Sequence, residues 1–341
     1  MEQEIKAYSI EEVEELVKAA KLPSFRALQI LQWIYAKGAA SYDEMTNIPA
    51  TMREQLAVAH PLLSPVVEER LISIDGTRKY LLSYSDGAVA ETVAIPSDDG
   101  RLSVCCSSQS GCGMRCSFCA TGQLGLTRSL LPGEIADQIL VVQNDFARRV
   151  TNVVIMGQGE PFANYRNTLA ALRIMNHPKL MGIGARHITI STCGLIPGIG
   201  RFAEEPEQFT LAVSLHSAIQ GTRDKLMPGC RQYPLDALRR AISHYIDKSG
   251  RRISFEYALM EGINDSDGDL EALVDYCRGL ICHVNLIPLN HIEGSPYRPV
   301  PARKLEEWLE MLETAGISAT IRNSRGADIA GACGQLAAGK H

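Results

Sequence analysis

Three cysteines in one short loop constrain this chain of 341 residues more than any other feature. The loop reads Gly111-Cys112-Gly113-Met114-Arg115-Cys116-Ser117-Phe118-Cys119, so its thiols are separated by three residues and then by two. An iron–sulfur cube takes four ligands, and a loop with three cysteines leaves one iron open. An open position on a metal centre is where a substrate or cofactor binds. We therefore predict a [4Fe-4S] cluster on Cys112, Cys116 and Cys119, with S-adenosylmethionine on the open iron, its usual place in radical enzymes.

Structural zinc and a disulfide are the alternative uses of these cysteines. Zinc knuckles close a tetrahedron with two Cys/His pairs, but this chain has no second CxxC or HxxxH pair. Cys105 or Cys106 could supply a fourth ligand, although the spacing then matches no common zinc pattern. Disulfides are disfavoured because the ten cysteines are scattered and no signal peptide opens the chain. We accordingly expect reduced thiols and a cytoplasmic protein.

The composition is that of a soluble globular protein, with 45% hydrophobic and 21% charged residues. No apolar run is long enough to span a bilayer, so we expect no membrane partner. The net charge of −5 is not the basic balance typical of a nucleic-acid-binding domain. Any contact with RNA must therefore come from a local basic surface.

The first 100 residues divide into two segments. Residues 1–60 are predicted to form a small helical domain, and the helix-capping signals within it are Ser9 with Glu12, Ser24, and Ser41 with Glu44. Residues 61–100 are predicted to form a β-meander, because three Asp-Gly pairs separate apolar runs there. These pairs are Asp75-Gly76, Asp86-Gly87 and Asp99-Gly100.

Strands and amphipathic helices alternate from about residue 102. The candidate strands are residues 102–107, 152–156, 187–191, 209–215, 253–258 and 283–288, followed by a last strand at 319–322. Six β/α units in series imply a parallel sheet that curls toward a barrel. We therefore predict an α/β fold in which residues 101–341 form a partial (β/α)6 barrel. Because it has fewer units than a closed eight-unit barrel, one side can stay open to a large substrate.

Polar loops follow these strands at their carboxyl ends, where active sites of such folds collect. The loops are the cysteine loop, Gly157–Pro161, Ser191-Thr192, Ser214-Leu215-His216 and Pro288-Leu289-Asn290. We expect all of them at one end of the barrel, which we call the mouth.

Several residues of these loops are candidate contacts of S-adenosylmethionine. Gly159 allows close approach of the backbone, and Glu160 can bind the amino group. Ser191, Ser214 and Asn290 offer partners for the ribose and adenine. Each also has an ordinary explanation: Gly157–Glu160 as a plain turn, and the hydroxyl and amide residues as strand-end caps. His216 is either a cofactor contact or a hydrogen-bonded core histidine.

Two further cysteines are candidates for chemistry. Cys105 ends the first barrel strand, and Cys333 lies between Gly331 and Gly334 in a tail that the glycines make mobile. An unpaired cysteine is most simply a small buried hydrophobe, and this is our interpretation of four others. They are Cys193, Cys230, Cys277 and Cys282.

The chain resembles the dual-cysteine radical-SAM RNA methyltransferases, the RlmN/Cfr group, nearly from end to end. The motifs that carry the resemblance are Glu91-Thr92-Val93, Ser107-Ser108-Gln109, the cysteine loop with Ala120-Thr121-Gly122, Met156–Pro161, Ser214–His216, Val284–Pro288, Arg325–Ile329 and Ala332–Leu336. The helical start resembles the accessory RNA-binding domain of this family.

The resemblance implies a two-stage transfer of a methyl group to an adenine of 23S rRNA, and in some members of tRNA. Cys333 would first accept a methyl group, and a second S-adenosylmethionine would then be cleaved to a radical that takes hydrogen from it. The resulting protein–RNA adduct would be resolved by Cys105, with Glu91 as proton acceptor. The cofactor would be held by Gly159, Glu160, Ser191, Ser214, Leu215, His216 and Asn290. The resemblance also implies an external electron donor and a monomeric enzyme.

Two branches of the group differ in the adenine carbon that they attack. Arg325-Gly326 and Gly159-Glu160-Pro161 resemble the carbon-2 branch, whereas the carbon-8 branch confers antibiotic resistance. The chain departs from the pattern at Gln158, at Cys106 and at Gly229-Cys230-Arg231. The alternative outside this family is a radical-SAM enzyme acting on a peptide or small molecule, which would need no methyl-carrying cysteine in its tail.

Overall fold

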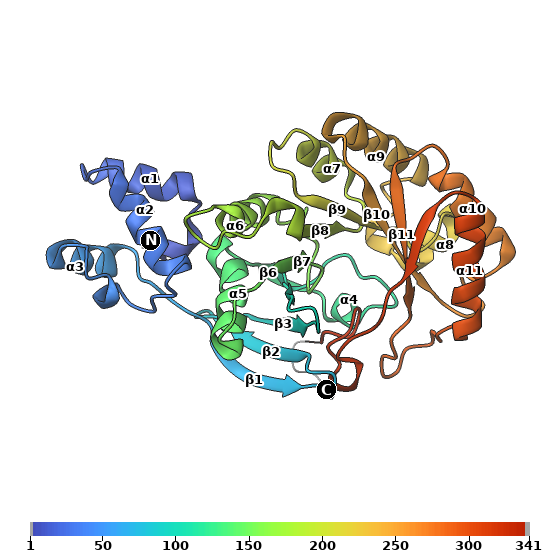
Figure 1. Ribbon diagram of the computed structural model, residues 1–341, viewed down its shortest axis with the longest axis horizontal. Coiled ribbons are helices and arrows are strands. Elements are labelled where there is room, and N and C mark those ends of the chain that lie inside the picture. Colours follow the sequence, from blue (N-terminus) through green and yellow to red (C-terminus); the bar gives the residue numbers. More distant parts are fainter. Residues whose placement is uncertain (1–2, 338–341) are drawn as a thin grey trace.

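The structure, a computed structural model, describes residues 3–337. Its N-terminal part is helical and lies at one end of the molecule (Figure 1). This part contains η1 (Ile5–Ala7), α1 (Ile10–Ala19), α2 (Phe25–Tyr35), η2 (Tyr42–Glu44) and α3 (Ala50–Ala59). Within residues 3–337, no helix is both long and apolar enough to cross a membrane.

Two of the three capping predictions hold. The Ser9 hydroxyl accepts a hydrogen bond from the Glu12 N–H, and the Glu12 carboxylate accepts one from the Ser9 N–H. The Glu44 carboxylate likewise accepts the Ser41 N–H, although it closes only the short turn η2. The prediction for Ser24 is wrong, because its backbone is already helical and its side chain makes no capping bond. An N-cap needs an extended backbone to point its oxygen at the first turn.

The predicted meander consists of β1 (Val66–Ile72), β2 (Arg78–Ser83) and β3 (Val89–Pro96). Antiparallel hairpins join these strands to one another and join β3 to β4 (Leu102–Cys105). The glycine of each Asp-Gly pair has a positive φ, which a hairpin turn requires and a side chain disfavours. The meander and the barrel thereby form one continuous sheet.

The barrel strands run parallel and pair in chain order, which confirms the predicted α/β class. They are β4, β7 (Asn152–Ile155), β8 (Ile188–Thr192), β9 (Thr210–Ser214), β10 (Ile253–Leu259), β11 (Cys282–Pro288) and β12 (Ser318–Ile321). Over residues 3–337 the sheet order runs from β1 to β12 without closing on itself. The barrel is therefore partial, as predicted.

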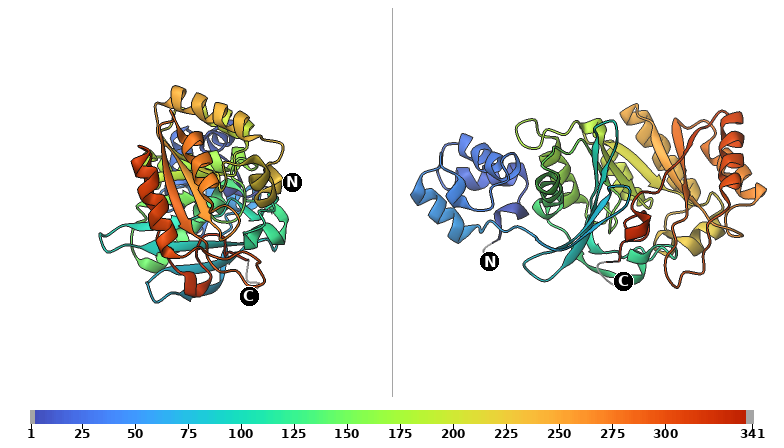
Figure 2. Two further views of the ribbon diagram at one scale, coloured as in Figure 1. Left: turned by 90° about the vertical axis from the view of Figure 1, so that its right-hand side faces the viewer. Right: turned by 60° about the horizontal axis from the view of Figure 1, so that its bottom comes forward.

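Helices cover the outer face of the sheet (Figures 1 and 2). They are α5 (Pro132–Phe146), α6 (Tyr165–Asn176), α7 (Ile196–Ala203), α8 (Gln220–Leu226), α9 (Leu235–Ser249), α10 (Asp267–Cys277) and α11 (Ala302–Thr314). Ile135, Ile139 and Val142 of α5 are fully buried, as their helical spacing predicts. The remaining elements are β5 (Gln109–Gly111), α4 (Ala120–Leu124), β6 (Leu126–Ser129) and the short turns η3 (Ala185–His187), η4 (Pro228–Cys230) and η5 (Ala327–Ile329).

A buried ion pair joins the helical part to the barrel. The Lys6 ammonium lies 2.8 Å from the Asp137 carboxylate of α5, and only 3% and 4% of the two side chains are exposed. Burial raises the pKa of Asp137 to about 6, with Lys6 opposing that shift. Removal of one partner would leave the other without its compensating charge in a buried place.

We expect Lys6→Met to lower the free energy of unfolding by about 3–5 kcal/mol, because Asp137 is left buried and unpaired. Urea-induced unfolding measures this change. Arg303→Met is the matched control, because it breaks the exposed Arg303–Glu307 pair of α11 and should cost about 0–1 kcal/mol. Equal losses from the two variants would contradict the assignment.

Candidate active site

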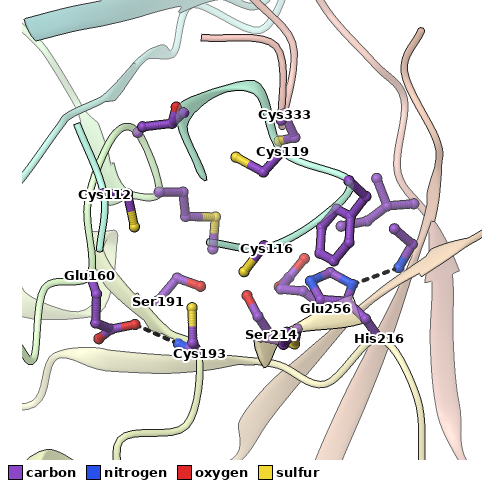
Figure 3. A pocket seen from close by; sticks show the side chains of 18 of the residues that line it. Cys112, Cys116, Cys119, Glu160, Ser191, Cys193, Ser214, His216, Glu256 and Cys333 are labelled. Carbon is purple, nitrogen blue, oxygen red and sulfur yellow. Dashed lines mark hydrogen bonds between the residues drawn. The ribbon is translucent and has the colours of Figure 1, made fainter. Parts of the chain in front are cut away.

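A cavity lies at the mouth of the barrel, with the three loop cysteines at its wall (Figure 3). Its lining includes Cys112, Cys116, Cys119, Gly159, Glu160, Ser191, Cys193, Ser214, His216, Glu256, Asn290, Arg322 and Cys333. These residues come from the cysteine loop, from the carboxyl ends of β7–β11, from β12 and from the C-terminal segment. The expectation that the polar loops meet at one mouth is therefore confirmed.

Close backbone contacts shape the cysteine loop. Gly111 has a φ of +74°, and a Cβ atom there would lie 2.0 Å from the Gly125 carbonyl oxygen. A Cβ atom on Gly122 would lie 2.7 Å from the Cys116 carbonyl oxygen. The Cys112 N–H donates to the Gly125 carbonyl, and the Cys119 N–H donates to the Cys116 carbonyl. The glycines thus let the loop fold tightly enough to bring three thiols to one cavity.

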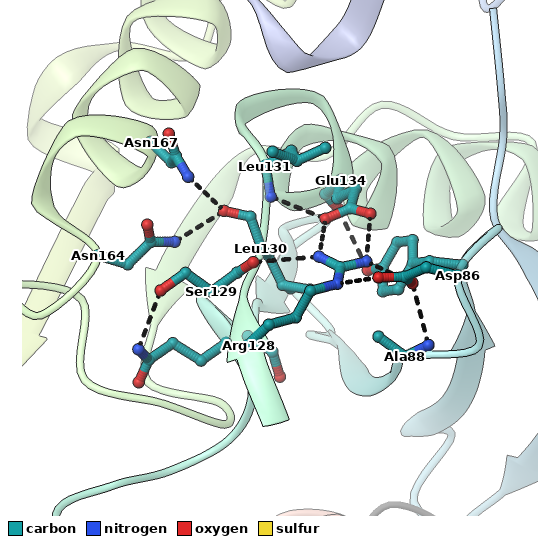
Figure 4. A network of polar contacts seen from close by, with 12 residues as sticks. Asp86, Ala88, Arg128, Ser129, Leu130, Leu131, Glu134, Asn164 and Asn167 are labelled. Carbon is teal, nitrogen blue, oxygen red and sulfur yellow. Dashed lines mark hydrogen bonds and ion pairs between the residues drawn. The ribbon is translucent and has the colours of Figure 1, made fainter. Parts of the chain in front are cut away.

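A second anchor holds the hairpin that flanks this loop (Figure 4). Arg128 of β6 bonds to both oxygens of Asp86, at 2.5 and 2.9 Å, and to both oxygens of Glu134. Asp86 belongs to the second Asp-Gly turn of the meander, and Glu134 begins α5. Bidentate contacts of this kind fix direction as well as distance, so β6 has a defined position beside the cysteines.

The three thiols suit a cluster better than a single metal ion. Among residues 3–337, no three Cys, His, Asp or Glu side chains are placed to hold one metal ion, as structural zinc would require. Cys112, Cys116 and Cys119 instead surround a cavity, and an iron–sulfur cluster is held by thiolates around its body. Burial raises the pKa of Cys112 to about 11 and raises that of Cys119. Metal binding must therefore displace their protons.

The Glu160 carboxylate is held by three donors. It accepts hydrogen bonds from the Cys193 N–H at 2.7 Å, the Phe162 N–H at 2.9 Å and the Thr192 hydroxyl at 2.8 Å. Burial raises its pKa, and the hydrogen bonds from Cys193 and Phe162 oppose that rise. The carboxylate is consequently fixed in the cavity wall, in a position to receive a cationic amine.

His216 was left open between a cofactor contact and a hydrogen-bonded core histidine, and the structure shows the hydrogen bond. It is buried and lines the cavity, and its Nδ1 accepts the Ala258 N–H at 3.0 Å. The neutral ring therefore carries its proton on Nε2. Burial, assisted by the charge of Arg223, lowers its pKa to about 3. His216 thus offers a neutral N–H donor rather than a charge.

Most of the other predicted cofactor residues line the same cavity. Gly159 has a φ of +100°, and a Cβ atom there would lie 2.6 Å from the Gln109 side chain. Ser191, Ser214 and Asn290 are partly buried at strand ends. Leu215 is the exception, because its side chain is fully buried in the main core and does not line the cavity. Its neighbours Ser214 and His216 both line the cavity, and the chain turns at His216, where φ is positive.

Cys333 lies where two cavities meet. It lines the first cavity beside Cys119, and it lines a second cavity together with Cys105 and Arg325. Its carbonyl accepts the Asn290 side-chain amide at 3.1 Å, and the Ala120 N–H donates to the Gly334 carbonyl. Cys105 faces the same space, where burial raises its pKa to about 12. Cys333 itself is exposed.

Glu91 lies apart from both cavities. Its carboxylate is buried, pairs with the Lys79 ammonium at 3.1 Å and accepts the Gln158 side-chain amide at 3.3 Å. The Glu91 N–H also donates to the Gln158 side-chain oxygen. Gln158, which departs from the family pattern, therefore holds Glu91 at two points.

Cys193, Glu256 and Arg322 are site residues that sequence reasoning missed. Cys193 was interpreted as a buried apolar residue, but it is partly exposed and lines the first cavity. Arg322 lines both cavities and pairs with Glu256 at 3.3 Å. Cys193 and Arg322 directly follow the carboxyl ends of β8 and β12, and this position was the signal available in the sequence, whereas Glu256 lies in the middle of β10.

Comparisons with known proteins agree with this geometry. The sequence model of the radical SAM superfamily matches residues 106–276. The model of the ribosomal RNA large subunit methyltransferase N-terminal domain matches residues 4–60.

Two curated relatives are each 42% identical to this chain and are named probable dual-specificity RNA methyltransferase RlmN. The protein from Thermoanaerobacter sp. is matched over 97% of both chains. The protein from Clostridioides difficile is matched over 97% of this chain and 96% of its own length.

A solved structure is also similar over nearly its whole length. It is a radical SAM methyltransferase from Sphaerobacter thermophilus, 43% identical, with a TM-score of 0.92 over 98% of this chain and 99% of that one. The chain therefore belongs to the radical SAM superfamily, whose members use a [4Fe-4S] cluster and S-adenosylmethionine, and within it to the RlmN family.

Proposed function

We propose that this protein methylates carbon 2 of an adenine in the peptidyl-transferase centre of 23S rRNA, and an adenine next to the anticodon in tRNA. The observation that carries the proposal is the position of Cys333, which lines both the cavity of the loop cysteines and the cavity of Cys105. A radical-SAM enzyme that does not carry a methyl group on its own chain needs no thiol at that junction. The names of the relatives, which refer to two RNA specificities, agree with two substrates.

Cys333 is the methyl acceptor of the first step in this proposal. Its thiol loses a proton, its sulfur forms a bond to the methyl carbon, and the bond from that carbon to the sulfonium sulfur of S-adenosylmethionine breaks. The Asn290 amide and the Ala120 N–H fix the backbone carbonyls of Cys333 and Gly334, on the C-terminal side of the thiol. A thiol that is already held in place lowers the entropy cost of bringing it together with S-adenosylmethionine.

Cys112, Cys116 and Cys119 would hold the cluster, which when bound supplies the electron that cleaves a second S-adenosylmethionine. Two molecules of this cofactor are thus used in each turnover, and an external donor supplies the electron. Glu160 would bind the amino group of S-adenosylmethionine, and the N–H of His216 would donate a hydrogen bond to a polar atom of the same cofactor. The methyl group on Cys333 would give a hydrogen atom to the deoxyadenosyl radical from that cleavage, and its carbon would then bond to the adenine ring. The adduct would give one electron back to the cluster and its ring proton to the proton acceptor.

Cys105 completes the proposed reaction. Its thiol loses a proton, its sulfur forms a disulfide with the Cys333 sulfur, and the bond from the Cys333 sulfur to the methylene carbon breaks. That carbon keeps the electron pair and takes up a proton, so the base is released with a methyl group, and a thiol reductant later reduces the disulfide. Glu91 is the proposed proton acceptor, and its buried contacts with Lys79 and Gln158 would set its orientation. We further expect the enzyme to act as a monomer.

The adenine must leave its stack to reach these groups, as for other enzymes that act on a base. Arg322 and Arg325 line the second cavity, where Glu256 and Asp75 pair with them. Phosphate contacts by Lys and Arg of a local basic surface set most of the affinity for RNA, so a net charge of −5 does not conflict with the substrate.

Nucleoside mass spectrometry tests the product. We expect rRNA and tRNA from a strain lacking this gene to gain 2-methyladenosine after incubation with the reduced, reconstituted enzyme and S-adenosylmethionine. The enzyme with Cys333→Ala, which has no methyl acceptor, is the control. Formation of 8-methyladenosine alone would show the other carbon to be the target, and no RNA product with either carbon methylated would reject the proposal.

Removal of the resolving thiol tests the role of Cys105. We expect Cys105→Ala to accumulate a covalent protein–RNA adduct, because the bond between Cys333 and the base can no longer be exchanged for a disulfide. Denaturing gels and mass spectrometry of the digested adduct detect it. Cys106→Ala is the matched control, because Cys106 is adjacent but fully buried and lines neither cavity. Normal turnover by Cys105→Ala would refute the role.

A further inference from the structure

The three Asp-Gly turns of the meander have different partners, although their sequences are alike. Within the described part of the chain, Asp99 pairs only with Arg101 of its own turn, at 2.7 Å. Asp86 pairs with Arg128 beside the cysteine loop. Asp75 pairs with Arg325, 250 positions further along the chain. A hairpin turn forms without contacts to distant segments. The ion pairs of Asp75 and Asp86 with distant arginines must therefore serve to hold those other segments.

The contact at Asp75 combines an ion pair with close packing of the backbone. Its Oδ2 lies 3.0 Å from Arg325 Nε and accepts the Gly326 N–H at 3.0 Å, while its carbonyl accepts Arg325 Nη2 at 2.9 Å. Gly326 has a φ of +67°, and a Cβ atom there would lie 2.7 Å from Thr77. The backbone after β12 therefore packs against this turn more closely than a side chain would permit.

A second set of contacts repeats the connection. The Ser73 hydroxyl donates to Asp328 at 2.5 Å, and the Ile74 N–H donates to the same carboxylate at 3.1 Å. The Lys79 ammonium lies 3.4 Å from the Ala330 carbonyl oxygen. The polar contacts thus follow the chain from Arg325 to within three residues of Cys333.

Little else holds this stretch. In residues 322–331 only Gly326 is buried, whereas Ala332, Gln335, Leu336 and Ala337 are buried further along. A segment without buried apolar side chains gains its order from hydrogen bonds and ion pairs. Most of the hydrogen bonds and ion pairs that residues 323–331 make with the rest of the described chain go to the turn of residues 73–77.

We propose that residues 73–77, which we call the Asp75 turn, form a positioning site that holds Cys333 at the junction of the two cavities. This inference rests on the proposed function, because Cys333 needs a fixed position only if it accepts a methyl group. The Asp75 carboxylate and the Arg325 guanidinium are the principal pair, and Asp328 is the second contact. These are positioning residues, since none of them lines the cavity of the loop cysteines.

The test compares Asp75→Ala, Arg325→Ala and the double variant with Asp99→Ala in the reconstituted holoenzyme. Asp99→Ala is the matched control because it alters the same kind of turn without touching the tail. Two measurements are made: hydrogen exchange of residues 322–333, and the rate at which Cys333 gains a methyl group from S-adenosylmethionine, followed by peptide mass spectrometry.

We expect each single variant to speed exchange of the tail roughly tenfold, the effect of losing a hydrogen bond to a charged group. The double variant should add little to either single change, because both remove the same contact. Methylation of Cys333 should slow in the order of the exchange rates, because it depends on the fraction of molecules whose tail is ordered. Arg325→Lys, which keeps the charge, should restore part of the rate.

The outcomes separate this inference from the proposed function. Wild-type protein whose Cys333 is never methylated would overturn both. Wild-type methylation together with unchanged exchange and unchanged methylation in Asp75→Ala and Arg325→Ala would overturn the positioning site alone. Equal effects from Asp99→Ala would overturn it as well, because the changes would then reflect general loss of sheet stability.

Discussion

Seven neighbouring strands run in one direction, and the site depends on this constraint. Parallel pairing requires each strand to be followed by a crossover, so every strand delivers a loop to the same edge of the sheet. Thiols, carboxylates, hydroxyls and an imidazole that are distant in sequence therefore surround one cavity. The sheet also supplies the backbone partners that fix them, as Ala258 of β10 does for His216. The hydrogen bonds of the sheet therefore also fix the side chains that line the cavity.

Much of this arrangement could be predicted because its signals are local. Apolar runs identified each barrel strand to within two residues, and the Asp-Gly pairs identified the hairpins because positive φ values demand them. The loop cysteines, Glu160, Ser191 and His216 were predicted to share a cavity from a single rule about strand ends. Ser24 shows the limit of a local signal, since its backbone conformation rather than its residue type decided that it would not cap a helix.

The remainder depends on contacts between distant segments, which residue spacing does not encode. Lys79 pairs with Glu91 because β2 and β3 lie side by side in a particular register. Gln158 reaches Glu91 across the join between meander and barrel. Arg322 and Cys193 line the cavity because they directly follow the ends of β12 and β8. Their residue types alone do not distinguish them from ordinary surface or core residues. The family resemblance implies Leu215 as a cofactor residue through the motif Ser214–His216, but its side chain is buried in the main core and does not line the cavity.

The segment that carries Cys333 comes after every strand of the sheet, and it returns to the first hairpin of the meander. Domains fold from the N-terminus during synthesis. The ribosome would thus release the last part of this site only after the barrel had been made. A chain that had emerged only as far as β12 would hold the cavity of the loop cysteines without the thiol that we propose as methyl acceptor. That thiol would therefore be the last group of the cavity to take its place.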